Sequence, residues 1–354
     1  MYMFASLLGL IVVVGSYGTA AENTIHSYDF NPETGVMTPI DSLSGVSNSS
    51  FLAVADEGQT LLAVNENTGD DDALTLLRRD DAPGVYRAVA VRGLGGDHPC
   101  HVVVSPDGKY VVTSNYTGGS ISVLGFDGDN GMLEEPTVVQ FHGCGADTVR
   151  QATAHAHFTS FTPDGKFMIT DDLGTDRLHI FPVGGDGRPE LDSMSDVILD
   201  AGSGPRHLVF AADGVNAYLL NELDGNIVHL VYDSEAGTIT PKQKILADYE
   251  HGRGSAHILL SHDGRHLYAS NRLKGDGIAI FDVNPEDGSL TASGFVATGI
   301  HPRHFAITPD GHWMLVGCRD SNRVEVYRLD AATGNLTLTS SVSVPKPVCI
   351  VFPD

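Results

Sequence analysis

Three stretches of this sequence share one pattern: His101-Val-Val-Val-Ser-Pro-Asp-Gly108, His157-Phe-Thr-Ser-Phe-Thr-Pro-Asp-Gly165 and His304-Phe-Ala-Ile-Thr-Pro-Asp-Gly311. Each runs from a histidine through an apolar strand to an Asp-Gly turn, and a second apolar strand follows. Asp-Gly between two strands favours a β-hairpin, because glycine accepts the positive φ that tight hairpin turns need. Two further copies carry Asp213-Gly214 and Asp263-Gly264, and a degenerate copy carries Glu57-Gly58.

The spacing of these turns defines the repeat. Their glycines stand at positions 58, 108, 165, 214, 264 and 311, so the interval is 47 to 50 residues with one exception of 57. A second turn recurs after a third strand, and its copies are Asn31–Gly35, Asp127–Gly131, Asp233–Gly237, Asn284–Gly288 and Asp330–Gly334. Each unit therefore contains four strands. A four-stranded repeat of about 50 residues is typical of a β-propeller blade.

The two ends of the chain complete a last blade. The chain ends in Val348-Cys-Ile-Val-Phe-Pro-Asp354, which is a first strand and half a turn. Leu8–Tyr17 and Ile25–Phe30 supply the missing second and third strands. The sequence therefore predicts an all-β fold, a single seven-bladed propeller over residues 1–354 whose closing blade is shared by N- and C-terminal strands.

The apolar N-terminus allows two interpretations. Met1–Val14, followed by Ala20-Ala21, imitates an export signal, but it lacks the basic residues with which such signals begin. Cleavage after Ala21 would remove the second strand of the closing blade and leave unpaired sheet edges. We therefore expect this segment to be a core strand and the protein to be cytoplasmic.

The composition restricts the kinds of partner and cofactor that this protein is expected to bind. The net charge of −24 argues against a nucleic-acid or membrane partner, because those surfaces need clustered positive charge. The four cysteines are isolated in sequence, so we expect buried free thiols rather than disulfides or a zinc site. His155-Ala-His157 could place two imidazoles on a metal, but no further ligands stand at suitable spacing, so neither a metal nor another cofactor is expected.

Polar residues gather at one mouth of the predicted channel. The start of a first strand and the end of the antiparallel second strand lie on the same face. First-strand starts carry His101, His157, Arg206-His207, His257 and Arg303-His304. Second-strand ends carry Asn65-Glu66, Asn115-Tyr116, Asp171-Asp172, Asn221-Glu222, Asn271-Arg272 and Cys318-Arg319.

Most of these histidines are explained by architecture. His101, His207, His257 and His304 each stand six residues before the turn aspartate, where a recurrent propeller histidine hydrogen-bonds neighbouring blades. His157 stands seven residues before Asp164, in register with Arg206 and Arg303. Because strand side chains alternate, His157 is predicted to face the other way from the recurrent histidine.

Four residues form the candidate catalytic site: His157, Arg206, Glu222 and Arg272. The last three come from adjoining blades and are expected to converge on His157. Ionisable groups brought together in a partly dry cleft are costly unless they pair or bind a ligand. His101, His155, Arg303, His304 and Arg319 are candidate substrate contacts, with a solvated rim position open for Arg319 and Glu66.

The motifs at these positions resemble the propeller lactonase family, which includes bacterial 6-phosphogluconolactonases and the fungal carboxy-muconate lactonising enzyme. The resemblance spans the chain and rests on Gly15–Thr19, His98–His101, Ser114–Tyr116, Arg150-Gln151, His155–His157, Asp172–Arg177, Gly204–His207, Asn221–Leu223, Ser270–Arg272, His301–His304 and Pro347–Ile350. It implies an active site of one His, two Arg and one Glu, which match His157, Arg206, Arg272 and Glu222. Ser16, Gly18 and Ala154 depart from the family's commoner residues.

The resemblance implies hydrolysis of a small anionic lactone, with 6-phosphogluconolactone in sugar metabolism as the expected substrate. Either Glu222 or His157 could take the proton of the attacking water while Arg206 and Arg272 bind anions. Two alternatives remain at this point. The same residues could serve a lactonising or isomerising enzyme for a carboxylated substrate, or the propeller could be a non-catalytic scaffold that binds partners through outer loops such as Asn67–Arg79.

Overall fold

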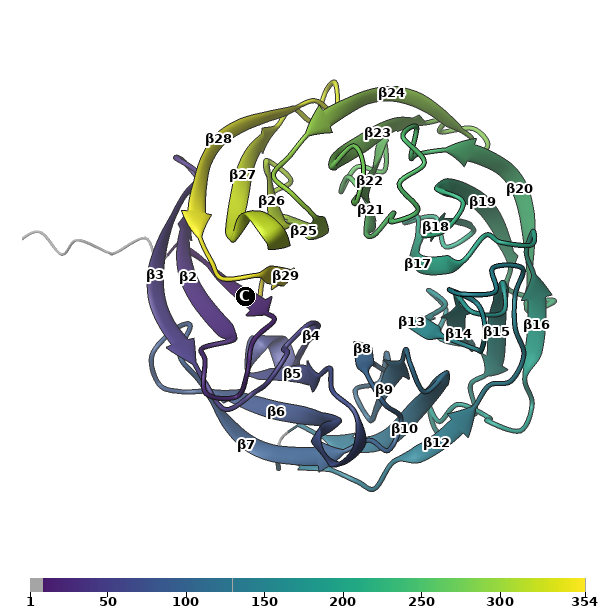
Figure 1. The fold of residues 1–354 in the computed structure, drawn as a ribbon, viewed down its shortest axis with the longest axis horizontal. Coiled ribbons are helices and arrows are strands. Elements are labelled where there is room, and N and C mark those ends of the chain that lie inside the picture. Colours follow the sequence, from purple (N-terminus) through teal and green to yellow (C-terminus); the bar gives the residue numbers. More distant parts are fainter. Residues whose placement is uncertain (1–8, 129, 354) are drawn as a thin grey trace, which may run out of the picture.

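The computed structural model describes residues 9–128 and 130–353, which form seven antiparallel sheets arranged in a ring (Figure 1). The predicted seven-bladed propeller is confirmed. We number the blades in chain order: blade 1 contains β4–β7, blade 2 β8–β12, blade 3 β13–β16, blade 4 β17–β20, blade 5 β21–β24, blade 6 β25–β28, and blade 7 β29 with β1–β3.

Each blade has four main strands, from the centre of the ring outward. The inner strands are β4 (Leu52–Ala55), β8 (Pro99–Val104), β13 (Ala156–Phe161), β17 (Pro205–Phe210), β21 (Ile258–Leu260), β25 (Pro302–Ile307) and β29 (Pro347–Val351). The second strands are β5 (Thr60–Asn65), β9 (Tyr110–Asn115), β14 (Phe167–Asp172), β18 (Asn216–Asn221), β22 (His266–Asn271), β26 (Trp313–Cys318) and β1 (Leu10–Ser16).

The third strands are β6 (Ala73–Arg79), β10 (Ser120–Asp127), β15 (Arg177–Pro182), β19 (Asn226–Asp233), β23 (Gly277–Val283), β27 (Arg323–Leu329) and β2 (Ile25–Asn31). The outer strands are β7 (Tyr86–Gly93), β12 (Thr137–Gln140), β16 (Ser195–Ile198), β20 (Thr238–Leu246), β24 (Leu290–Ala297), β28 (Leu336–Ser343) and β3 (Val36–Leu43), and a short extra strand, β11 (Met132–Leu133), pairs with β10. Three 3₁₀ turns are η1 (Asp56–Gly58), η2 (Gly69–Asp71) and η3 (Arg319–Ser321). Within the described residues, no helix is long and apolar enough to cross a membrane.

Blade 7 closes the ring with strands from both ends of the chain. Val14 of β1 lies opposite Ile350 of β29 on one side and opposite His26 of β2 on the other. In Figure 1 the yellow β29 accordingly lies beside purple strands. The predicted shared blade is confirmed; Leu8, the expected start of its second strand, lies outside the described residues.

The hydrophobic core consists of seven clusters, one between each pair of neighbouring blades. The packing of β1 explains why its sequence is continuously apolar. Val12 and Val14 pack against blade 6, whereas Ile11 and Val13 pack against blade 1. A strand covered on both faces buries every side chain, so alternation with polar residues disappears.

The Asp-Gly turns have the predicted conformation. Gly108, Gly165, Gly214, Gly264 and Gly311 all have φ between 68° and 72°. A residue with a Cβ atom is strained at these angles, which explains the repeated glycine. The turn Asp127–Gly131 includes residue 129, which lies outside the described part of the chain.

Two expectations are wrong. Asn67–Arg79 is not an outer loop, because Ala73–Arg79 is β6, and the apolar run Ala73–Leu77 is buried within blade 1. Cys144 is exposed, whereas Cys100, Cys318 and Cys349 are buried free thiols as expected. Cys144 lies in the long connection between β12 and β13, outside the alternating strands that bury the other three.

Aromatic rings fill the centre of the ring of blades. Phe51 from blade 1 contacts His101, His207 and His304, with centroid separations of 4.3, 6.2 and 5.6 Å. The recurrent histidines also bond between blades: the Thr159 N–H donates to His101 Nδ1 at 3.3 Å, and the Ile350 N–H donates to His304 Nδ1 at 3.2 Å. His207 and His257 also lie within hydrogen-bond distance of each other, at 2.9 Å, so all four histidines make the expected contacts between blades. We call these rings, with Phe158, the aromatic plug.

Candidate functional site

Four inner strands carry a β-bulge at the same place. The pairing with the second strand shifts by one residue at Cys100, His157, Arg206 and Arg303. A bulge inserts a residue that has no opposite partner and re-aims its side chain. The predicted common register of His157, Arg206 and Arg303 is confirmed, and its cause is this bulge.

Above the plug lies a cavity of about 180 Å³ at the mouth where second strands end. Its lining residues come from six blades and from the connection between β12 and β13: Glu66, Cys100, Tyr116, Arg150, His157, Glu222, Arg272 and Arg303. Glu66, Tyr116, Glu222 and Arg272 each directly follow a second strand. The convergence predicted from strand ends is therefore confirmed for Glu222 and Arg272, and His157 lines the same cavity.

Three arginines surround the carboxylate of Glu222. Arg206 Nε donates to Glu222 Oε2 at 2.9 Å, and Arg272 Nη2 donates to the same oxygen at 3.0 Å. Arg150 Nη2 donates to Oε1 at 2.5 Å. Burial alone would raise the pKa of Glu222, but attraction by Arg272, Arg206 and Arg150 outweighs burial and lowers this pKa to about 2.

Arg206 and Arg272 are held on several sides by the protein. Arg206 Nη1 donates to the carbonyl of Ala256. Arg272 Nε donates to the carbonyl of Gly254 at 2.7 Å, and its Nη1 lies 3.3 Å from His301 Nε2. Burial, followed by repulsion from Arg272 and Arg303, lowers the pKa of Arg206 to about 9, so its guanidinium is charged at neutral pH. These two arginines and Glu222 form a fixed ionic frame.

Arg303 is mostly buried and only loosely paired. Its Nη2 lies 3.8 Å from Glu66 Oε2, beyond hydrogen-bond distance, and its guanidinium stands 5.5 Å from the centre of the Tyr17 ring. The Tyr17 hydroxyl donates to the same Glu66 oxygen at 2.8 Å. Arg303 therefore presents hydrogen-bond donors to the cavity.

His157 is a neutral imidazole in the cavity wall. Burial, followed by the charges of Arg206, Arg303 and Arg272, lowers its pKa well below 6.5. Nδ1 is shielded from solvent and has no hydrogen-bond partner among the described residues. The ring contacts Tyr116 and His207 edge to face at 5.6 and 5.4 Å. The neutral ring has an unprotonated nitrogen, which is the form that a general base needs.

The other predicted contacts lie elsewhere. His101 and His304 belong to the plug below the cavity. His155 stacks on Tyr116 at 4.6 Å and bonds the Tyr116 carbonyl through Nδ1 at 2.8 Å, so it supports the wall. Arg319 does not line the cavity and pairs with Asp320 at 2.7 and 2.9 Å.

Sequence reasoning did not select Arg150, Tyr116 or Cys100 as site residues. Arg150 lies in the connection between β12 and β13, which accounts for the single long interval of 57 residues. The extra length of this connection is the sequence feature that could have pointed to Arg150. Cys100 had none, since its bulge position becomes apparent only from the pairing of β8 with β9.

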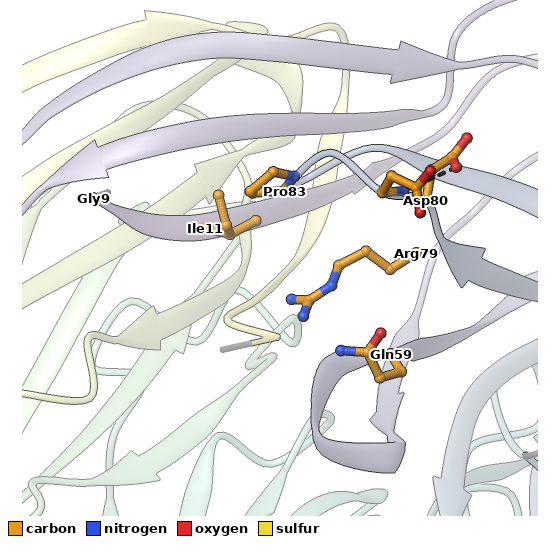
Figure 2. A pocket seen from close by; sticks show the side chains of 7 residues that line it. Gly9, Ile11, Gln59, Arg79, Asp80 and Pro83 are labelled. Atoms are coloured by element: carbon orange, nitrogen blue, oxygen red, sulfur yellow. Dashed lines mark hydrogen bonds between the residues drawn. The ribbon is translucent and has the colours of Figure 1, made fainter. Parts of the chain in front are cut away.

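A larger cavity of about 490 Å³ lies at the opposite face, beside the start of β1. Figure 2 shows Arg79 extending between Ile11 and Gln59. No member of the predicted site lies there. Across residues 9–128 and 130–353, no cluster of three His, Cys, Asp or Glu side chains could hold a metal.

Comparisons with known proteins identify the family of this chain. A family profile described as "Lactonase, 7-bladed beta-propeller" matches residues 11–352. A 6-phosphogluconolactonase of Formosa agariphila is 33% identical over 91% of this chain and 93% of its own length. A 6-phosphogluconolactonase of Bacillus subtilis is 30% identical over 96% of this chain and 97% of its own.

Solved structures are also similar to this chain. A candidate 6-phosphogluconolactonase from Bacteroides fragilis has a TM-score of 0.92 and 38% identity, covering 99% of both chains. A periplasmic gluconolactonase from Pseudomonas aeruginosa has a TM-score of 0.88 and 29% identity, covering 97% of this chain and 98% of its own.

Proposed function

Because the chain belongs to the lactonase family of seven-bladed β-propellers, we propose that it hydrolyses 6-phosphogluconolactone in the cavity lined by His157, Glu222, Arg272 and Arg303. The relatives named above as 6-phosphogluconolactonases support this substrate. The observation that carries the proposal is the mostly buried Arg303 in the cavity wall, because its nearest carboxylate, Glu66, lies at 3.8 Å, beyond hydrogen-bond distance. A buried cation of this kind favours an anionic or polarised ligand.

The charge of the cavity fits the same substrate. Four arginines stand in or directly behind its wall, against the two carboxylates Glu66 and Glu222. This positive site lies in a protein with a net charge of −24. Nearby guanidinium groups are therefore needed to bind an anion, because the negative charge of the whole protein repels it.

In the proposed mechanism His157 is the general base. It takes a proton from water as the water oxygen attacks the lactone carbonyl carbon. Arg303 donates to the carbonyl oxygen, which becomes the oxyanion of the tetrahedral intermediate. The bond from this carbon to the ring oxygen then breaks, and the ring oxygen takes the proton from the imidazolium. The products are a free hydroxyl group and a carboxylic acid, which releases its remaining proton to solvent to become the carboxylate, and His157 is neutral again.

Glu222 is the weaker choice for the base. Its Oε2 accepts hydrogen bonds from the buried Arg206 and Arg272, so protonation of Glu222 would leave both arginines without their counter-charge. We propose that Glu222 keeps Arg206 and Arg272 in place and that Arg272 adds to the positive potential at the oxyanion.

The test is hydrolysis of 6-phosphogluconolactone measured above its spontaneous rate, with phosphate-free gluconolactone for comparison. The protein should accelerate the phosphorylated lactone more strongly. Conservative variants Arg206→Lys and Glu222→Gln should both reduce kcat/KM. Absence of acceleration by the wild type, or full activity in both variants, would refute the proposal and favour a non-catalytic scaffold.

We also propose that the protein remains in the cytoplasm. β1 ends at Ser16, so cleavage after Ala21 would remove a strand that pairs with β2 and β29. Sequencing the N-terminus of the protein from its host should find residues upstream of Leu10. A sequence beginning at Glu22 would contradict retention of this strand.

A further inference from the structure

Arg150 differs from the other arginines of the cavity in its exposure. Its side chain is 36% exposed, compared with 14% for Arg303 and 6% for Arg272. It lies in the connection between β12 and β13, whereas Arg272 and Arg303 lie at strand ends. Arg150 therefore stands at the solvent side of the cavity.

The contact between Arg150 and Glu222 is replaceable. Arg206 and Arg272 already pair with the single negative charge of Glu222 through Oε2. Arg150 uses one nitrogen, Nη2, for both Glu222 Oε1 and the Tyr116 hydroxyl. Its Nε and Nη1 have no hydrogen-bond partner in the described residues, so they can donate to a ligand.

The backbone that presents Arg150 is firmly anchored. Asp147 Oδ1 accepts the backbone N–H groups of Val149 and Arg150 at 2.9 Å each. The buried side chain of Gln151 donates to the Leu173 carbonyl at 2.8 Å and to Asp176 at 2.7 Å. Movement is therefore confined to the Arg150 side chain, which can turn without reordering the loop.

A phosphate group fits this solvent-side position better than the deep part of the cavity. A dianion is strongly hydrated, and moving it among buried groups costs more free energy than leaving one side in water. The lactone ring can lie deeper, beside His157 and Arg303. A guanidinium matches phosphate oxygens with two parallel hydrogen bonds.

We propose that Arg150 determines specificity by leaving Glu222 to bind the phosphate of a phosphorylated sugar lactone at the open side of the cavity. This proposal rests on the proposed lactonase function and names the residue that selects phosphorylated over neutral substrates. Glu222 keeps its two buried arginines while Arg150 is engaged with the ligand.

The test compares the binding of 6-phosphogluconate and gluconate, two products that differ only in the phosphate, by isothermal titration calorimetry. The wild type should bind 6-phosphogluconate at least about 10-fold more tightly. Arg150→Met, which keeps the length of the side chain without its charge, should reduce this ratio on the order of 10- to 100-fold. The ratio of kcat/KM for the two lactones should fall in parallel.

Arg177→Met is the matched control, because Arg177 is 37% exposed and pairs with Asp196 on the outer part of blade 3. It should leave the ratio unchanged. An unchanged ratio in Arg150→Met, or equal weakening of both ligands, would overturn the proposal. A wild type that hydrolyses neither lactone would refute the proposed function instead, and the binding ratio would still decide the role of Arg150.

Discussion

At the scale of single residues, the candidate site contains two groups that could accept a proton, the His157 imidazole and the Glu222 carboxylate. His157 and Glu222 line the same cavity, but their surroundings differ. Burial and nearby arginines keep His157 neutral, whereas three arginines keep Glu222 ionised. The positive charge of the nearby arginines therefore favours the unprotonated form of both the His157 imidazole and the Glu222 carboxylate. In the proposed mechanism His157 is the acceptor, because no guanidinium among the described residues donates a hydrogen bond to its ring, whereas Arg206 and Arg272 both donate to Glu222.

His157→Asn should lower kcat by about 10²- to 10⁴-fold, because it removes the proposed base. The variant gives up no hydrogen bond at Nδ1, but it loses the ring contacts with Tyr116 and His207, so a modest loss of stability is also expected. In the wild type, kcat/KM should stay constant as pH falls through 6.5, because the pKa of His157 lies well below that value. His142→Gln, an exposed histidine, is the control. An activity loss centred at pH 6.5 or above would argue against His157.

Glu222→Gln should lower the free energy of unfolding by about 3–5 kcal/mol, because it leaves the buried Arg206 and Arg272 without their counter-charge. Urea unfolding at pH 7.5 measures this effect. Glu135→Gln, which removes the exposed partner of Arg92, should have no measurable effect. If the two variants were equally stable, Glu222 would not be the counterion of the frame.

At the scale of elements, β-bulges and strand ends place the site on the fold. The bulges at Cys100, His157, Arg206 and Arg303 give each of these side chains a position that regular pairing would not. The closing blade has a comparable role, because β1 joins both ends of the chain and brings Tyr17 beside Glu66 and Arg303. Closure of the ring and completion of the site therefore depend on the same strand.

Val13→Asp should prevent stable closure, because Val13 is fully buried between blades 7 and 1 and a carboxylate there would have no partner. We expect a loss of more than about 4 kcal/mol, or insoluble protein. Val91→Asp on β7, where the side chain is 62% exposed, should change stability by less than about 0.5 kcal/mol. Equal solubility and unfolding midpoints for both variants would show that closure by β1 is dispensable.

At the scale of the whole molecule, the aromatic plug joins blades that are far apart in the ring. Phe51 of blade 1 contacts His207 of blade 4. The plug adjoins the wall of the cavity, because His207 contacts the His157 ring edge to face at 5.4 Å. Burial, followed by repulsion from His304, lowers the pKa of His101 to about 3, so the plug is uncharged at neutral pH.

The plug should make the protein acid-sensitive. His101 binds a proton more weakly in the folded protein than in the unfolded chain, so its contribution to stability is complete above pH 6.5 and is lost as pH falls toward 3. Each such histidine contributes a slope of up to about 1.4 kcal/mol per pH unit. His101→Phe should therefore reduce the drop in the free energy of unfolding between pH 7.5 and 4.5, despite losing the bond from Thr159.

Phenylalanine suits this test because Phe158 already occupies the corresponding place in blade 3. The exposed His312→Gln should leave the pH dependence as it is in the wild type. Urea titrations at both pH values provide the measurement. A drop in His101→Phe as large as in the wild type would exclude His101 as a source of the acid sensitivity.

The sequence by itself determined the seven blades, the closing blade and the mouth that carries the site. These follow from local signals, since turn glycines, strand alternation and the repeat interval are set by neighbouring residues. The placement of Glu222, Arg272 and His157 around one cavity followed from which strand ends share a face.

Only the tertiary structure decided how the charges are shared. Arg206, Arg272 and Arg150 converge on one carboxylate from two adjoining blades and a loop, while Arg303 is left with donors toward the cavity. Side-chain pairing across blades depends on distances of a few ångströms that no repeat pattern contains. For that reason the sequence located the channel mouth, and the folded ring decided which of its arginines pair with Glu222.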